Sequence, residues 1–223
     1  MKDSISGSIV GVIRNDEGLY EGNLAHYFRV VFFQAQNIRH PYHNLRHMLH
    51  VLWLCFEAIK YYHQQGRPIS LRVARSILIA ALFHDFDHSG QLGNDDLNIE
   101  RAVRGLKKCI LPEDVFYLDD IVALLWVTEY PYKVPSDALE LPGQILRDAD
   151  MSQSLNVAWL QQVVVGLSTE WGKTPLEILK AQGGFHKSLV FHTEWARERF
   201  PQELVNQKIN EARELLELLD TTT

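Results

Sequence analysis

The chain has 223 residues, of which 46% are hydrophobic and 22% charged, and its formal net charge is −6. This length and composition are ordinary for one globular domain with a proper core, and the acidic balance argues against a general nucleic-acid-binding protein. The sequence has no signal peptide, no membrane-spanning apolar run, and no zinc or disulfide spacing around Cys55 and Cys109, so we expect a cytoplasmic protein without nucleic-acid or membrane partners.

The spacing of apolar residues predicts helices through most of the chain. Residues 1–22 lack helical periodicity and are expected to form an irregular arm ahead of a helical domain, residues 23–223. Helices are then expected at 23–37, 44–66, 70–85, 95–109, 113–129, 155–171, 174–196 and 201–220. Asn44 and Ser70 are suitable N-caps, and the three prolines of 130–143 indicate a connecting loop. Because no alternating strand pattern is found, we predict a single all-α domain.

Four histidines are concentrated near the start of the second predicted helix, at positions His40, His43, His47 and His50. If that helix begins after Asn44, His47 and His50 lie within it and His43 lies just ahead of it. Neutral imidazoles are good metal ligands, but this segment alone can supply at most two or three. Histidines packed beside aromatic residues are the other interpretation of this segment.

A second polar cluster, "HDFDH" (84–88), follows a helix that is apolar on nearly every face. Burial of an unpaired carboxylate is costly, so Asp85 is expected to be paired or to bind a metal ion beside His84. A third segment, "LRDADM", offers Asp148 and Asp150. Both could be surface aspartates at a helix start, but their apolar neighbours indicate that at least one side chain points inward.

These segments, in this order, resemble the HD phosphohydrolase superfamily, and most closely the catalytic domain of the cyclic nucleotide phosphodiesterases. "YHNLRH" (42–47) is similar to that family's YHNxxH element, and "HDFDHSG" (84–90) is similar to its HDxDHxG element. "ADMS" (149–152) resembles the family's ADLS segment, and "QGGF" (182–185) resembles its QxGF segment. The chain is considerably shorter than the family's catalytic domains.

The resemblance implies a compact multi-helix domain with two divalent metal ions in its core, each of them Zn, Mg, Mn, Fe, Co or Ni. The implied ligands of the first ion are His47, His84, Asp85 and Asp150. Asp85 would also bridge to the second ion.

The resemblance further implies three catalytic roles outside this ligand set. His43 would be the general acid, His88 would order the site near the second metal, and Glu100 would support His43. The implied substrate contacts are Tyr42, Gln182 and Phe185.

The expected activity is therefore hydrolysis of a phosphodiester, and the expected phosphodiester is a cyclic nucleotide or a related nucleotide. A metal-activated water would attack phosphorus while His43 protonates the leaving alkoxide. A nucleotide monophosphatase or an alarmone-type pyrophosphohydrolase could use the same ligands, and a non-catalytic metal-binding module is a further alternative. A diiron oxygenase of this superfamily is a less favoured alternative. Such enzymes have two extra histidine ligands between the HD pair and the last aspartate, whereas His88 is the only histidine between Asp85 and Asp150.

Overall fold

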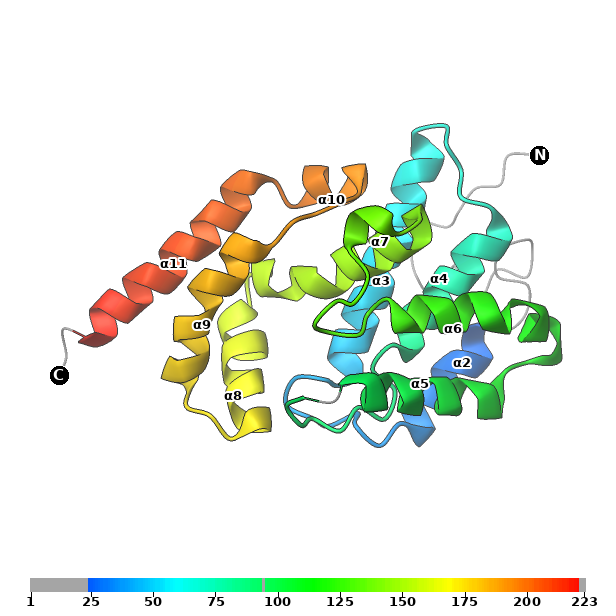
Figure 1. The fold of residues 1–223 in the computed structure, drawn as a ribbon, viewed down its shortest axis with the longest axis horizontal. Helices are drawn as coiled ribbons and strands as arrows, with labels where there is room; N and C mark the ends of the chain where they lie inside the picture. The colour runs from blue at the N-terminus through cyan, green and yellow to red at the C-terminus, as the bar shows by residue number, and fades with distance from the viewer. Residues whose placement is uncertain (1–23, 94, 221–223) are drawn as a thin grey trace.

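The computed structural model describes residues 24–93 and 95–220, which form helices and connecting loops without any β-strand (Figure 1). This confirms the predicted all-α fold. The irregular arm predicted for residues 1–22 lies outside the described residues. Across the described ranges, none of the helices combines the length and the apolar character needed to cross a membrane.

The first part of the chain contributes six α-helices. They are α2 (Leu24–Gln34), α3 (Leu45–Gln64), α4 (Leu71–Phe83), α5 (Asp95–Cys109), α6 (Leu118–Trp126) and α7 (Leu141–Met151). The predicted caps are confirmed: the Asn44 side chain accepts hydrogen bonds from two backbone N–H groups at the start of α3, and Ser70 accepts one at the start of α4. Helix α7 begins inside the predicted loop, since a proline is tolerated in the first turn of a helix.

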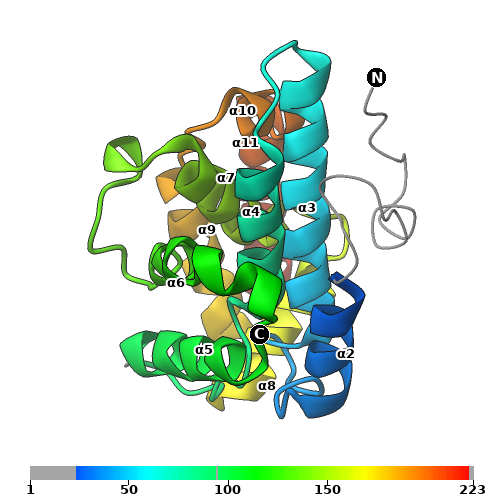
Figure 2. The ribbon, with the colours of Figure 1, turned by 90° about the vertical axis from the view of Figure 1, so that its right-hand side faces the viewer.

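Helix α4 is the centre of this part. Every residue from Ala74 to Phe83 is buried, because α2, α3, α5, α6 and α7 all pack against it. Figure 2 shows α3 and α4 running side by side, with α5 and α6 crossing them. The apolar character of α4 therefore places its C-terminal end, where "HDFDH" begins, in the interior.

The remaining helices form the other side of the molecule (Figure 1). They are α8 (Gly166–Trp171), α9 (Pro175–Ser188), α10 (Glu194–Arg199) and α11 (Gln202–Asp220), and a π-helical turn, Leu160–Val165, leads into α8. Helices α9 and α11 pack together around a second apolar cluster that includes Trp159, Leu167 and Ile178. The site described below lies where this cluster meets the first part.

Three predicted helices are not continuous α-helices. The one expected at 155–171 follows a 3₁₀ turn, Ser152–Leu155, and contains the π-helical turn before α8. The one expected at 174–196 divides into α9 and α10, because Asp148 binds the backbone N–H groups of His192 and Thr193, and Thr193 then caps α10. The one expected at 113–129 begins as a 3₁₀ turn, Pro112–Tyr117, and ends as α6 at Trp126. At 174–196 the helical periodicity continues in the sequence, while the tertiary contacts of Asp148 end the helix.

Candidate metal centre

The start of α3 fixes the positions of His43 and His47. The Asn44 side-chain oxygen accepts hydrogen bonds from the backbone N–H groups of Arg46 (2.8 Å) and His47 (3.1 Å), and its amide donates to the carbonyl of His40 (2.7 Å). His47 therefore lies in the first helical turn with only 2% of its surface exposed, while His43 precedes the helix. The arrangement is the one expected from an N-cap at Asn44.

The segments that carry His43 and Asp85 are held together by Asn37, which is fully buried. Its amide donates to the backbone carbonyls of His43 (2.8 Å) and Asp85 (2.7 Å), and its side-chain oxygen accepts from the backbone N–H of Asp87 (3.0 Å). Asp87 adopts a left-handed conformation with φ of 60°, which turns the chain after α4. Asn37 was not predicted, because no local pattern marks an amide that joins two distant turns.

Three predicted ligands, His47, His84 and Asp150, have donor atoms that all lie within 4.8 Å of one another, and Asp85 adjoins both histidines. The Nε2 atom of His47 lies 3.0 Å from Asp150 Oδ1 and 3.4 Å from Asp85 Oδ2. The Nε2 atom of His84 lies 3.4 Å from Asp85 Oδ2 and 3.6 Å from Asp150 Oδ1. Donor atoms bound at about 2.1 Å around one ion are themselves about 3.0 to 3.4 Å apart, so this spacing suits a single divalent cation.

The hydrogen bonds on the outer sides of the two rings strengthen this fit. His84 Nδ1 contacts the carbonyl oxygen of Ala81 at 2.8 Å, and His47 Nδ1 contacts the side-chain oxygen of Gln153. Since each of these oxygens accepts a hydrogen bond from Nδ1–H, the Nε2 atoms keep lone pairs that could bind a metal ion. His84 Nε2 and Asp85 Oδ2 are buried without a hydrogen-bond partner among the described residues. A cation bound between them would satisfy both atoms.

The electrostatics of the metal-free cluster agree with its geometry. Burial alone would lower the pKa of His84, but the charges of Asp85 and Asp150 raise it to about 9. Burial alone would raise the pKa of Asp85, but His84 and His43 hold it well below its ordinary value. Without a metal ion, a proton on His84 thus balances the buried carboxylate.

The two aspartates of "LRDADM" have different environments. Asp150 lies in the cluster, whereas Asp148 points away from it and accepts hydrogen bonds from His192 and Thr193, including the Thr193 hydroxyl at 2.8 Å. Asp148 is thus a structural residue that anchors the loop before α10. Position 150 is the one that the resemblance to the ADLS segment indicated.

A second group of side chains adjoins the cluster. His43 Nδ1 lies 2.5 Å from Glu170 Oε1, and Glu170 Oε2 accepts the backbone N–H groups of Tyr42 (2.8 Å) and His43 (3.1 Å). The prediction that Glu100 supports His43 is wrong, because Glu100 is exposed on α5 and the carboxylate beside His43 belongs to Glu170 on α8. The two residues of this pair are far apart in the chain, so sequence periodicity gives no signal for it.

His88 packs flat against His43, with ring centroids 3.7 Å apart and planes inclined by 19°. The backbone N–H of Gly90 donates to His88 Nδ1 at 3.0 Å. A Cβ atom on Gly90, whose φ is +72°, would lie 3.0 Å from the Glu170 side chain. The glycine of "HDFDHSG" thus allows Glu170 to approach the two histidines.

The four predicted ligands and the stacked histidines His43 and His88 line one cavity of about 640 Å³. The predicted substrate contacts Tyr42, Gln182 and Phe185 also line it, together with apolar side chains of the second cluster such as Leu167 and Ile178. Gln182 is 5% exposed, and its Oε1 atom has no hydrogen-bond partner among the described residues. Within the described ranges, the lining contains no Lys or Arg.

No protein-family model matches this chain, and a search of curated proteins returns no match either.

Proposed function

We propose that this protein is a metal-dependent phosphoric ester hydrolase that cleaves a phosphodiester, a cyclic nucleotide or a related nucleotide. One observation carries the proposal. The donor residues His47, His84, Asp85 and Asp150 line the same cavity as His43, whose Nδ1 atom contacts Glu170. Phosphodiester hydrolysis needs an activated water, charge neutralisation and a proton for the leaving oxygen, and these two groups suit those tasks.

The donor cluster would hold the first of two divalent ions, and Asp85 would also serve the second. Such ions would supply Lewis-acid activation of water and neutralise the charge on the phosphoryl group. The mixture of imidazole and carboxylate donors is compatible with Zn, Mg, Mn, Fe, Co or Ni. The unpartnered Nε2 of His84 and Oδ2 of Asp85 are the atoms that support a bound cation here.

His43 would hold the proton that the leaving alkoxide receives. Glu170 binds Nδ1, so the other ring nitrogen, Nε2, is available to carry the transferred proton. Burial lowers the pKa of His43, although Asp85 and Glu170 act in the opposite direction. A histidine with a lowered pKa is a stronger acid when protonated, and stacking against His88 limits rotation of its ring.

The rest of the cavity supports a substrate of nucleotide size. Its volume of about 640 Å³ lies within the range of ordinary small-molecule sites. Phe185 would contact a nucleobase, and Gln182 Oε1 could accept a hydrogen bond from it. The absence of Lys and Arg from the described lining favours a singly charged diester over a pyrophosphate, whose greater charge would lack partners.

A substrate panel tests the proposal. The full chain would be stripped with a chelator, reloaded with each of the six metals, and assayed with 3′,5′-cyclic nucleotides, 5′-mononucleotides and an aryl phosphodiester. We expect diester hydrolysis only after reloading, no release of phosphate from mononucleotides, and no metal or activity in Asp85→Ala. His43→Ala should retain the metal and lose turnover of cyclic nucleotides. Hydrolysis of mononucleotides alone, or of no ester with any metal, would refute the proposal.

A further inference from the structure

Tyr132 lies in the loop between α6 and α7. Its side chain lines the cavity, and its hydroxyl is buried without a hydrogen-bond partner among the described residues. A buried hydroxyl without a partner is unfavourable unless a ligand completes its hydrogen bonding. Nothing in the proposed metal and acid chemistry accounts for this group.

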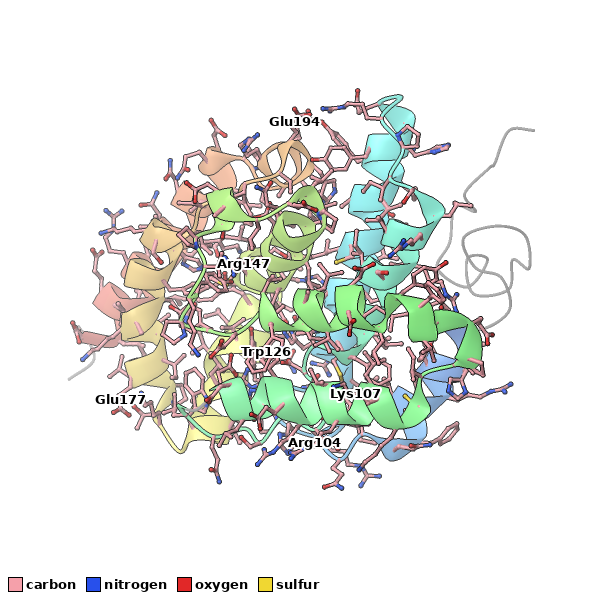
Figure 3. All side chains as sticks on the ribbon, turned by 45° about the vertical axis from the view of Figure 1, so that its right-hand side comes forward. Arg104, Lys107, Trp126, Arg147, Glu177 and Glu194 are labelled. Carbon is pink, nitrogen blue, oxygen red and sulfur yellow. The ribbon has the colours of Figure 1, made fainter. Side chains whose placement is uncertain are left out.

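Tyr132 is held rigidly by Arg147, which projects from α7 three residues before Asp150. The guanidinium carbon of Arg147 lies 3.7 Å from the centroid of the Tyr132 ring. The same guanidinium donates to the carbonyls of Val127 (2.8 Å) and Val134 (2.7 Å), which are on either side of Tyr132 in the chain. Arg147 is 3% exposed, and its label stands near the middle of the view in Figure 3. Arg147 thus fixes the loop around the phenol, and binding a ligand would not require ordering of this side chain.

Among the described residues, the cavity wall has two buried hydroxyls without partners, those of Tyr132 and Ser154. The Tyr132 hydroxyl is distinguished by its position, because its ring packs on Arg147, about one turn before Asp150 on α7, and so lies at the metal end of the cavity. Burial, followed by the charge of Asp150, raises the pKa of Tyr132 far above its ordinary value. The phenol therefore remains protonated and acts as a donor.

From these contacts we propose that Tyr132 is a substrate-binding residue whose hydroxyl donates a hydrogen bond to a non-bridging phosphoryl oxygen. The inference rests on the proposed function, because it assumes that a phosphate group occupies the metal end of the cavity. The described lining has no Lys or Arg that could bind the phosphoryl oxygen through a positive charge. The phenol would bind this oxygen through a hydrogen bond instead. A neutral donor of this kind suits a singly charged diester.

The test compares Tyr132→Phe with Tyr61→Phe, in the full chain loaded with metal. Tyr61 is a suitable control because its hydroxyl bonds to Glu198 at 2.6 Å outside the cavity. Both variants keep the aromatic ring, so Arg147 retains its contact in Tyr132→Phe. We expect Tyr132→Phe to lower kcat/KM for the hydrolysed diester by roughly 10- to 100-fold. Metal content and Tm should remain unchanged, and Tyr61→Phe should have full activity.

Sulfur substitution identifies the atom that is contacted. In the two phosphorothioate diastereomers of a cyclic nucleotide, a different non-bridging oxygen is replaced by sulfur, which accepts hydrogen bonds poorly. The ratio of kcat/KM between the diastereomers should change by about tenfold in Tyr132→Phe and stay constant in Tyr61→Phe. An unchanged ratio in Tyr132→Phe would overturn the inference, even if its overall activity fell.

Binding of inorganic phosphate separates this inference from the proposed function. If no diester is hydrolysed, the proposed function fails, but the Kd of the metal-loaded chain for inorganic phosphate can still be measured by calorimetry. A Kd about tenfold weaker in Tyr132→Phe than in Tyr61→Phe would support the contact. Equal values in the two variants would overturn it.

Discussion

Replacement of Glu170 by glutamine tests whether the carboxylate on α8 orients the acid. Glutamine has the same shape, so it can still accept a backbone N–H from Tyr42 or His43, but it removes the charge that faces His43 Nδ1 at 2.5 Å. A hydrogen bond to a charged group contributes about 1.5 to 3 kcal/mol. At 1.36 kcal/mol for each factor of ten, kcat for a cyclic nucleotide should fall by roughly 10- to 150-fold. KM and metal content should change little, since Glu170 lies outside the ligand cluster.

The leaving group supplies the decisive comparison. An alkoxide needs a proton as it departs, whereas a nitrophenolate is stable without one. Glu170→Gln should therefore slow hydrolysis of a cyclic nucleotide strongly and hydrolysis of a bis(nitrophenyl) phosphate only slightly. Glu214→Gln, at an exposed position of α11, is the matched control and should leave both rates unchanged. Equal losses on both substrates would contradict the assignment of His43 as the acid supported by Glu170.

Three further predictions concern stability and metal retention. Asp148→Ala should lower the free energy of unfolding by about 3 to 5 kcal/mol in urea titrations, because it leaves buried N–H and hydroxyl donors without an acceptor. Asp150→Ala should mainly reduce metal content. If Asp148→Ala and Asp150→Ala lowered the stability of the metal-free protein equally, the structural role of Asp148 and the metal-binding role of Asp150 would be contradicted. Asn37→Ala should lower the free energy of unfolding by about 3 kcal/mol and weaken metal retention, since three backbone groups lose their partner. If neither quantity changes, water replaces the amide. Burial lowers the pKa of His50 to about 4. Between about pH 6.5 and pH 4, His50 is therefore protonated in the unfolded chain but not in the folded chain. The free energy of unfolding should thus decrease by at most about 3 kcal/mol as the pH is lowered through this window. His50→Gln should flatten this pH dependence. An identical pH profile in the variant would refute the lowered pKa of His50.

The parts of the fold that could be predicted depend on local physics. Asn44 and Ser70 mark helix starts because their side chains satisfy backbone N–H groups within the same turn. The burial of α4 follows from apolar residues on every face. In contrast, the helix expected at 174–196 is interrupted by Asp148, a residue about 45 positions earlier in the chain, and no window of sequence contains that contact.

In the candidate site, too, local segments could be predicted and contacts across the fold could not. His47, His84, Asp85 and Asp150 lie in short segments whose residue types indicate metal binding, and the structure brings them together. Glu170, Asn37 and Tyr132 could not be identified in this way. Their roles arise from contacts across the fold: Glu170 meets a histidine 127 positions away, and Asn37 binds backbone atoms rather than side chains of a motif.

The contact between Glu170 and His43 has a consequence for the order of biosynthesis. All four donors of the metal cluster precede residue 151, whereas Glu170 and the Gln182 wall of the cavity are translated later. A growing chain therefore contains the complete donor set before it contains the carboxylate that orients the acid. The residues that we propose to bind metal are thus synthesised before the carboxylate that we propose to orient the acid.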